Sequence, residues 1–470
     1  MNAATLAAFL AYLLGLFLIA GVAWVRTRDV TDYALGGRTL GPAVTALSAG
    51  ASDMSGWLLL GLPGAVYLAG VREAWILVGL VAGAWINWLV VAAPLRRATA
   101  AEAEGGGALT IPEFLVRRLA RDAHPGLVRA LRVTATVAVL FFFTFYVSSG
   151  LVAGARLFES TLELPYTQAL FIGGGVIVAY TVAGGFLAVA WTDFFQGLLM
   201  LGALVAVPVV LTVQPGVPMP SPEALDPFRD LGPLAWLSLV AWGLGYFGQP
   251  HILARFMAIE SEAAVPRARR IGMSWMIVCG IAAVAVGMGG RVWFAPPLRG
   301  EDAETVFIAL TQTLFLPAFA GVVLAAILAA VMSTIDSQLL VASTALAEDL
   351  YRPMLRPAAS PRELVHVGRL AVLAVAGVAL ALALDPDNRV LTLVSYAWAG
   401  LGASFGPVIL LALHWRPLTA AGALAGMLTG GGTVILWGEL SGGLFELYEI
   451  VPGFLAGTLV AVGVSRATRD

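Results

Sequence analysis

Charged residues are scarce in this chain of 470 residues, and lysine is missing altogether, since all 27 basic residues are arginines. Only 12% of the residues are charged, 59% are hydrophobic, and the mean hydropathy is +0.88. Soluble domains carry about 25% charged residues, so this chain has too little polar surface to face water on every side. The composition excludes a soluble enzyme and a disordered protein, and predicts an all-α polytopic membrane protein in a lipid bilayer.

Cysteine and excess charge of either sign are also lacking. The single cysteine, Cys279, lies in an apolar run, which excludes a disulfide within the chain and a thiolate metal site. The net charge of −2 gives no basic field that would attract nucleic acid. The four histidines are far apart in the sequence, so no transition-metal site is expected.

Long apolar runs, in contrast, are abundant. A helix that crosses a bilayer needs about 20 mostly apolar residues, and about 13 runs meet this requirement. They are 5–24, 44–69, 74–95, 129–157, 165–188, 190–213, 233–257, 269–291, 317–348, 366–384, 389–412, 417–436 and 447–465. Two connecting segments, 110–121 and 302–313, are expected to form short helices on the inside and the outside, respectively.

The arginines orient these spans. Of the 27 arginines, 21 fall in one set of alternate segments, Arg255 among them, and six fall in the other set. Because segments rich in arginine stay in the cytoplasm, we expect the N-terminus outside and the C-terminus inside.

The spacing of the runs indicates an internal repeat. Residues 44–213 and 233–412 each hold five spans, and an odd number of spans inverts the second block relative to the first. Inverted repeats are typical of secondary transporters. We therefore expect one membrane domain over residues 1–470, with a peripheral first helix and two peripheral C-terminal helices in 417–465.

Span 44–69 contains Asp53 among several glycines and a proline. A tightly packed helix is one interpretation, because glycine and proline are common in membrane helices. The other interpretation is a broken helix whose free backbone groups bind an ion and a carboxylate. Asp53 favours a functional site, because a carboxylate at mid-membrane costs about 2.5–3.5 kcal/mol.

Polar residues also mark three later spans. In span 233–257, Trp242 and Tyr246 lie four residues apart among glycines, as an aromatic packing stripe or as part of a binding site. In span 317–348, the hydroxyls of Ser333 and Thr334 either bond back to their own helix or serve as oxygen ligands of a hard cation such as Na⁺. Asp193 lies near the start of span 190–213, where a solvated position is the alternative to a functional one.

The chain resembles the sodium:solute symporter family, and within it the proline branch, over roughly residues 30–435. The motifs that carry the resemblance are DYALGGRTLGP, LSAGASDMSGWLLLGLPGAVYLAG, GAWINW, SSGLVAGARLFES, GGFLAVAWTD, AWGLGYFGQPHILARFMA, AILAAVMST and NRVLTLVSYAWAGLGASFGP. The resemblance implies a LeuT-like core of inverted five-helix repeats. It also implies sodium-coupled uptake of L-proline by alternating access, without enzymatic chemistry.

By position, the resemblance also implies the site residues. The Na⁺ ligands would be Ala51, Met54, Ala330, Ser333 and Thr334. The substrate site would contain Ser55, Trp57, Tyr146, Trp242, Tyr246 and Pro250. Coupling or gating would involve Arg38, Asp53, Asp193 and Asp336. The acidic residue at 336 departs from the uncharged residue of the family pattern, which leaves one or two sodium ions per cycle as alternatives.

Two other functions stay open at the level of the sequence. One is Na⁺-coupled uptake of another small carboxylate or compatible solute, and the other is a sensor that binds proline without transporting it. Li⁺ is a possible substitute for Na⁺. We expect the chain in the bacterial cytoplasmic membrane, functional as a monomer.

Overall fold

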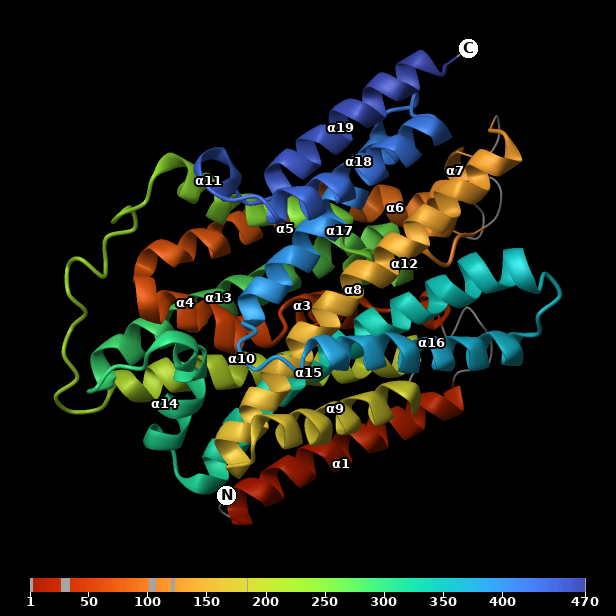
Figure 1. Cartoon of the computed structure of the whole chain (residues 1–470). Helices are drawn as coiled ribbons and strands as arrows, with labels where there is room; N and C mark the ends of the chain where they lie inside the picture. Colours follow the sequence, from red (N-terminus) through yellow and green to blue (C-terminus); the bar gives the residue numbers. More distant parts are fainter. Residues whose placement is uncertain (1–2, 27–33, 101–106, 120–122, 184, 470) are drawn as a thin grey trace.

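The computed structural model describes residues 3–26, 34–100, 107–119, 123–183 and 185–469, and these residues form helices joined by short connections (Figure 1). Short 3₁₀ or π segments are labelled η. The first block contains α1 (Ala3–Arg26), η1 (Gly36–Arg38), α3 (Pro42–Asp53), η2 (Trp57–Gly61), α4 (Leu62–Ala69), η3 (Val71–Ala74), α5 (Trp75–Val90), α6 (Ala92–Ala98), α7 (Ile111–Leu119), α8 (Pro125–Leu162), α9 (Tyr166–Ala183) and α10 (Phe186–Thr212). The rest contains α11 (Pro233–Val240), η4 (Ala241–Gly248), α12 (Pro250–Ala258), η5 (Glu262–Ala264), α13 (Val265–Trp293), η6 (Gly300–Thr305), α14 (Val306–Leu314), α15 (Pro317–Thr344), η7 (Ala345–Leu355), α16 (Pro361–Leu382), α17 (Val390–His414), α18 (Ala420–Gly438), η8 (Gly443–Glu446) and α19 (Ile450–Ala467).

Helical segments lie at all the apolar runs that the sequence marks as spans. Among the described residues, nine helices are long and apolar enough to cross a membrane, and three further apolar helices are shorter. The number of complete crossings and the sides of the termini remain predictions. The boundary between two spans, expected at 188–190, lies a few residues earlier, because Gly185 is extended and α10 begins at Phe186.

Two predicted spans are interrupted. The first divides into α3 and η2–α4, because Met54 leaves helical geometry directly after Asp53. The second divides into α11–η4 and α12, because Gln249 adopts an extended conformation before Pro250 at the first position of α12. A proline at that position fits a helix start and cannot continue the preceding helix. The interpretation of the first interruption as a broken helix is thus confirmed.

α3 lies at the centre of the bundle and packs against α10, α12, α13 and α15. In Figure 1, α1 and α9 lie on one flank of the bundle, whereas α18 and α19 pair on the opposite flank beside α17. Glycine permits close approach between the blocks: a Cβ at Gly83 in α5 would overlap the backbone of Gly243 in η4. α5 and η4 therefore pack closely through small residues.

The two short helices expected between spans are present. α7 occupies most of 110–121, of which residues 120 and 121 lie outside the described part of the chain. α14, preceded by η6, occupies most of 302–313.

Candidate functional site

The hydroxyls in α15 meet the end of α3. The Ser333 hydroxyl donates to the Ala51 carbonyl oxygen at 2.8 Å, and the Thr334 hydroxyl lies 3.4 Å from the same oxygen. Ser333 also lies 3.1 Å from the Ala330 carbonyl of its own helix, which confirms that its hydroxyl bonds back to its helix, whereas its role as a cation ligand stays a prediction. Four of the five residues expected to bind Na⁺ therefore converge, in a fully buried position.

Met54, the fifth expected ligand, ends α3. Its N–H donates to the Gly50 carbonyl at 2.8 Å, and its ψ of 76° turns the chain out of the helix. Carbonyl groups near such a turn lack the next helical partner. Because hard cations are held by several oxygen atoms, backbone carbonyls and two hydroxyls form a suitable ligand set. Among the described residues no group of three His, Cys, Asp or Glu side chains forms a metal site.

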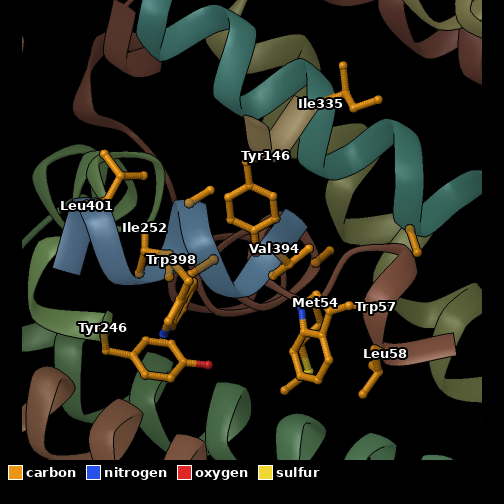
Figure 2. Packing of buried hydrophobic residues seen from close by; sticks show 14 of the residues in the cluster. Met54, Trp57, Leu58, Tyr146, Tyr246, Ile252, Ile335, Val394, Trp398 and Leu401 are labelled. Carbon is orange, nitrogen blue, oxygen red and sulfur yellow. The ribbon is translucent and has the colours of Figure 1, made fainter. Parts of the chain in front are cut away.

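Three aromatic residues from different elements surround the interruption after α3. The Trp57 indole and the Tyr146 hydroxyl of α8 each donate to the Asp53 carbonyl oxygen at 3.1 Å. The Tyr246 hydroxyl of η4 donates to the Asp53 carboxylate. Figure 2 shows the rings of Tyr146, Tyr246 and Trp57 arranged around the same part of the core. Asp53 thus links both interrupted segments with α8.

Trp242 adds a second layer of aromatic rings. Its ring centroid lies 6.4 Å from that of Trp57 and 5.4 Å from that of Tyr448, with which it stacks. Its carbonyl oxygen accepts a hydrogen bond from the Trp398 indole at 2.7 Å, and Trp398 packs edge-on against Tyr246. Tyr448, just before α19, was not expected near the site, because its helix was predicted to be peripheral.

The two remaining residues expected in the substrate site, Ser55 and Pro250, lie in different places. Ser55 lies in the interruption, where the Trp57 N–H points to its hydroxyl at 3.4 Å. Pro250 is buried at the start of α12, and it lines a different small cavity together with Ala254 and Leu340. The structure therefore brings Ser55, Trp57, Tyr146, Trp242 and Tyr246 into one aromatic region and places Pro250 outside it.

Arg38 connects two distant segments of the chain through hydrogen bonds to their backbones. It donates to the carbonyl oxygens of Met257 at 3.0 Å and Ala108 at 2.6 Å. Beside it, Leu40 and Ile259 form a short parallel bridge. The start of the first interrupted span is therefore tied to the end of the second.

Asp193 is buried rather than solvated. It accepts hydrogen bonds from Ser48 at 2.6 Å and from Arg255 at 3.0 Å, and both charged side chains are 0% exposed. Arg255 also donates to Ser48 at 3.0 Å, to the His251 carbonyl at 3.0 Å and to Ser337. The interfacial alternative for Asp193 was wrong, because the start of α10 packs into the core.

Arg255 is a buried charged residue of this region that the sequence did not single out. The arginine count assigns it to the cytoplasmic side at the end of span 233–257, whereas it lies inside the bundle on α12. The opposite charges of Asp193 and Arg255 in two apolar runs could have predicted this ion pair, because charges within membrane segments pair with one another. Asp336 lies within electrostatic range of both Asp193 and Arg255, and neither of its carboxyl oxygens has a hydrogen-bond partner among the described residues.

A larger cavity opens beside Trp242. Its volume is about 400 Å³, and its lining includes four carboxylates and one arginine. We call it the vestibule; its charged lining residues are Glu73, Glu304, Arg389, Glu446 and Glu449. Trp242 and Tyr448 also line it, so the stacked pair separates the vestibule from the aromatic region around Asp53.

The fold and this site define a multi-pass membrane protein with the architecture of cation-coupled symporters. A Na⁺-coupled sialic acid symporter in a substrate-bound outward-open state superposes with a TM-score of 0.82 at 17% identity, over 100% of this chain and 99% of the other. Mhp1, a nucleobase-cation-symport-1 family transporter in a closed conformation, superposes with a TM-score of 0.56 at 13% identity, over 94% of this chain and 95% of the other. At these identities the likeness concerns the fold.

Sequence comparison gives the family. The model of the sodium:solute symporter family matches residues 33–430. The sodium/proline symporter of Salmonella typhimurium (strain LT2) is 52% identical, over 97% of this chain and 91% of its own length. The high-affinity proline transporter PutP of Bacillus subtilis (strain 168) is also 52% identical, over 97% and 96%. The chain belongs to the sodium:solute symporter family.

Proposed function

We propose that this chain takes up L-proline together with Na⁺ by alternating access. The observation that carries the proposal is the 52% identity, over almost the whole length, to proteins named for sodium/proline symport and proline transport. It is supported by the meeting of α3 and α15, where the Ala51 carbonyl oxygen and the hydroxyls of Ser333 and Thr334 gather. Such a site suits a transported monovalent cation.

We propose the following division of roles. Ala51, Met54, Ala330, Ser333 and Thr334 bind Na⁺, and the aromatic region around Asp53 binds the substrate. Trp57, Trp242 and Tyr246 offer flat apolar faces for a pyrrolidine ring, as in pockets that combine aromatic walls with a few polar groups. Backbone N–H groups at the start of η2 can donate to the substrate carboxylate, because the N–H groups of the first helical turn have no partners within the helix.

Coupling follows from the shared use of α3. Na⁺ that ties Ala51 to Ser333 also fixes the end of α3, two residues before Asp53 and next to the substrate site. Ordering that end favours proline binding, and proline must then favour Na⁺ binding by the same factor. One charge that enters at a membrane potential of 100 mV supplies about 2.3 kcal/mol, enough for roughly 40-fold accumulation at about 1.4 kcal/mol per tenfold.

The topology belongs to the same proposal. We infer 13 spans, an outside N-terminus, a cytoplasmic C-terminus, and inverted repeats over 44–213 and 233–412, within one domain. The two interrupted spans support the repeats, because they begin the two blocks at equivalent places. The arginine asymmetry supports the orientation, and the bacterial relatives support a cytoplasmic-membrane location. We propose that the single chain is functional.

The test is labelled-proline uptake into proteoliposomes with an inward Na⁺ gradient, against an equal K⁺ gradient. We expect accumulation above equilibrium with Na⁺ and none with K⁺, and Li⁺ is a possible substitute for Na⁺. Binding of proline without accumulation would refute transport and favour a sensor. Accumulation of a different carboxylate, with no response to proline, would retain symport and refute the substrate.

A further inference from the structure

Asn87 of α5 is a buried polar residue to which nothing above assigns a role. It is 1% exposed, and neither its amide oxygen nor its amide nitrogen has a hydrogen-bond partner among the residues that the structure describes. A buried amide without partners costs free energy. A ligand or ordered water that binds it would remove this cost.

Asn87 lines a small enclosed cavity that also contains the free oxygen of Asp53. The Tyr246 hydroxyl binds one carboxylate oxygen of Asp53, whereas Oδ1 has no partner within the described chain. The cavity has a volume of about 30 Å³ and lies between α3, α5, η4, α12 and α13. Figure 2 shows Met54, Tyr246 and Ile252 of its lining on the side of the aromatic region. We call it the Asn87 cavity.

The lining of this cavity favours an organic ammonium group over a bare metal ion. Asp53, Asn87 and Tyr246 are its only polar side chains, and the rest of the lining is apolar, including Met273 and Met276. Hard cations are held by many oxygen atoms at once, which this lining does not provide. A ring that carries an ammonium group needs an apolar wall for the ring and a few hydrogen-bond acceptors for the N–H groups.

We propose that Asn87 is a substrate-binding residue, which together with Asp53 binds the secondary ammonium group of a cyclic imino acid in the Asn87 cavity. This proposal rests on the proposed function and extends its substrate site toward α5 and α13. A secondary ammonium group has two N–H donors, and the cavity offers two free acceptors, Asp53 Oδ1 and Asn87 Oδ1. The amide N–H groups of Asn87 remain available to the substrate carboxylate.

Space for the ring of the substrate would come from flexible side chains in the lining of the Asn87 cavity. The cavity itself has room for about one or two water molecules, since a water needs about 10–15 Å³. Met273 and Met276 have unbranched side chains that adapt to the shape of a neighbour. Tyr246 lines the cavity and bonds to Asp53, so movement of this ring would enlarge the cavity.

The test compares proline with N-methylproline, which has lost one of the two N–H donors. Inhibition of labelled-proline uptake is measured for wild type, Asn87→Ala and Asn87→Asp. We expect Asn87→Ala to weaken proline about tenfold and to weaken N-methylproline much less, so that the preference for proline decreases. Asn87→Asp keeps an acceptor oxygen and should keep the preference. Na⁺ activation should not change in either variant at saturating proline.

Thr136→Val is the matched control, because Thr136 is a buried polar residue of α8 whose hydroxyl already bonds to the Arg132 carbonyl. It should leave both inhibition constants unchanged. If Asn87→Ala shows too little uptake, thermal stabilisation of the purified Asn87→Ala protein by the two ligands gives the same ratio, and loss of the preference in Asn87→Asp would also contradict the proposed acceptor. An unchanged preference in Asn87→Ala, with proline uptake intact, would overturn the role of Asn87 alone. Absence of any wild-type response to proline would overturn the proposed function as well.

Discussion

Removal of the buried arginine tests whether the ion pair in the core holds the transporter together. In Arg255→Met, the Asp193 carboxylate keeps the Ser48 hydroxyl and loses the guanidinium 3.0 Å away. Asp336 loses a nearby positive charge at the same time and still faces the carboxylate of Asp193. Both members of the pair are 0% exposed, so water does not replace the lost partner.

The expected cost is large. Removal of one partner from a buried ion pair costs about 3–5 kcal/mol, which corresponds to a roughly 100- to 4,000-fold change in the unfolding equilibrium at about 1.4 kcal/mol per tenfold. The double variant Arg255→Met with Asp193→Leu removes both charges and should cost less than the sum of the two single variants, because apolar replacements of a buried pair are often neutral.

The assay is equilibrium unfolding in detergent micelles for the two single variants, the double variant and wild type. Arg97→Met is the matched control: Arg97 also pairs with a carboxylate, Glu262, but its side chain is 73% exposed, so its loss should change stability little. A single variant as stable as the control would refute the reasoning, as would exact additivity in the double variant. Proline uptake by the same proteins shows whether the pair also serves transport.

Three further predictions concern the proposed Na⁺ site, the stacked pair of Trp242 and Tyr448, and the vestibule. Ser333→Ala should raise the Na⁺ concentration for half-maximal proline uptake at least about tenfold, because it removes a proposed ligand; an unchanged Na⁺ dependence would exclude Ser333. Tyr448→Ala should raise the KM for proline about 2- to 12-fold, because stacked aromatic pairs are worth about 0.5–1.5 kcal/mol, whereas Tyr448→Phe keeps the stack with Trp242 and should retain most of the affinity. Burial raises the pKa of Glu304 above its usual range, against backbone hydrogen bonds that lower it. Acidification neutralises Glu304 at a higher pH than an exposed glutamate, so the apparent Na⁺ affinity should fall as the pH is lowered in wild type and should fall less steeply in Glu304→Gln. Equal pH profiles would contradict this role.

The sequence predicted the helical segments well, because each apolar run must satisfy its backbone groups within a helix. It also offered a broken helix as one of two interpretations of span 44–69, since glycine and proline at Gly56 and Pro63 weaken a helix, but it did not place the break directly after Asp53. The resemblance then identified residues that meet in space, such as Ala51 and Ser333, although 282 positions separate them in the chain.

Other features depended on packing that no local pattern contains. Arg255 was assigned to the arginine-rich side because such counting treats every charge near a span end as exposed. Tyr448 was assigned to a peripheral helix, yet the connection before α19 folds over Trp242. Asn87 was invisible because a single neutral amide in the apolar stretch GAWINW changes neither hydropathy nor charge. Its significance appears only beside the free oxygen of Asp53.

The position of α3 explains how an ion and a substrate affect each other without contact. Along this helix, Ser48 bonds to Asp193 and Arg255, Ala51 accepts from Ser333, and Asp53 accepts from Tyr246. These contacts join α3 to α10, α12, α15 and η4 within six residues. A rotation or shift of α3 must therefore alter all of them together, and Na⁺ at the proposed site beside Ala51 would restrict that movement. Substrate at the proposed site beside Asp53 would restrict the same movement, so each ligand would reduce the entropic cost of binding the other.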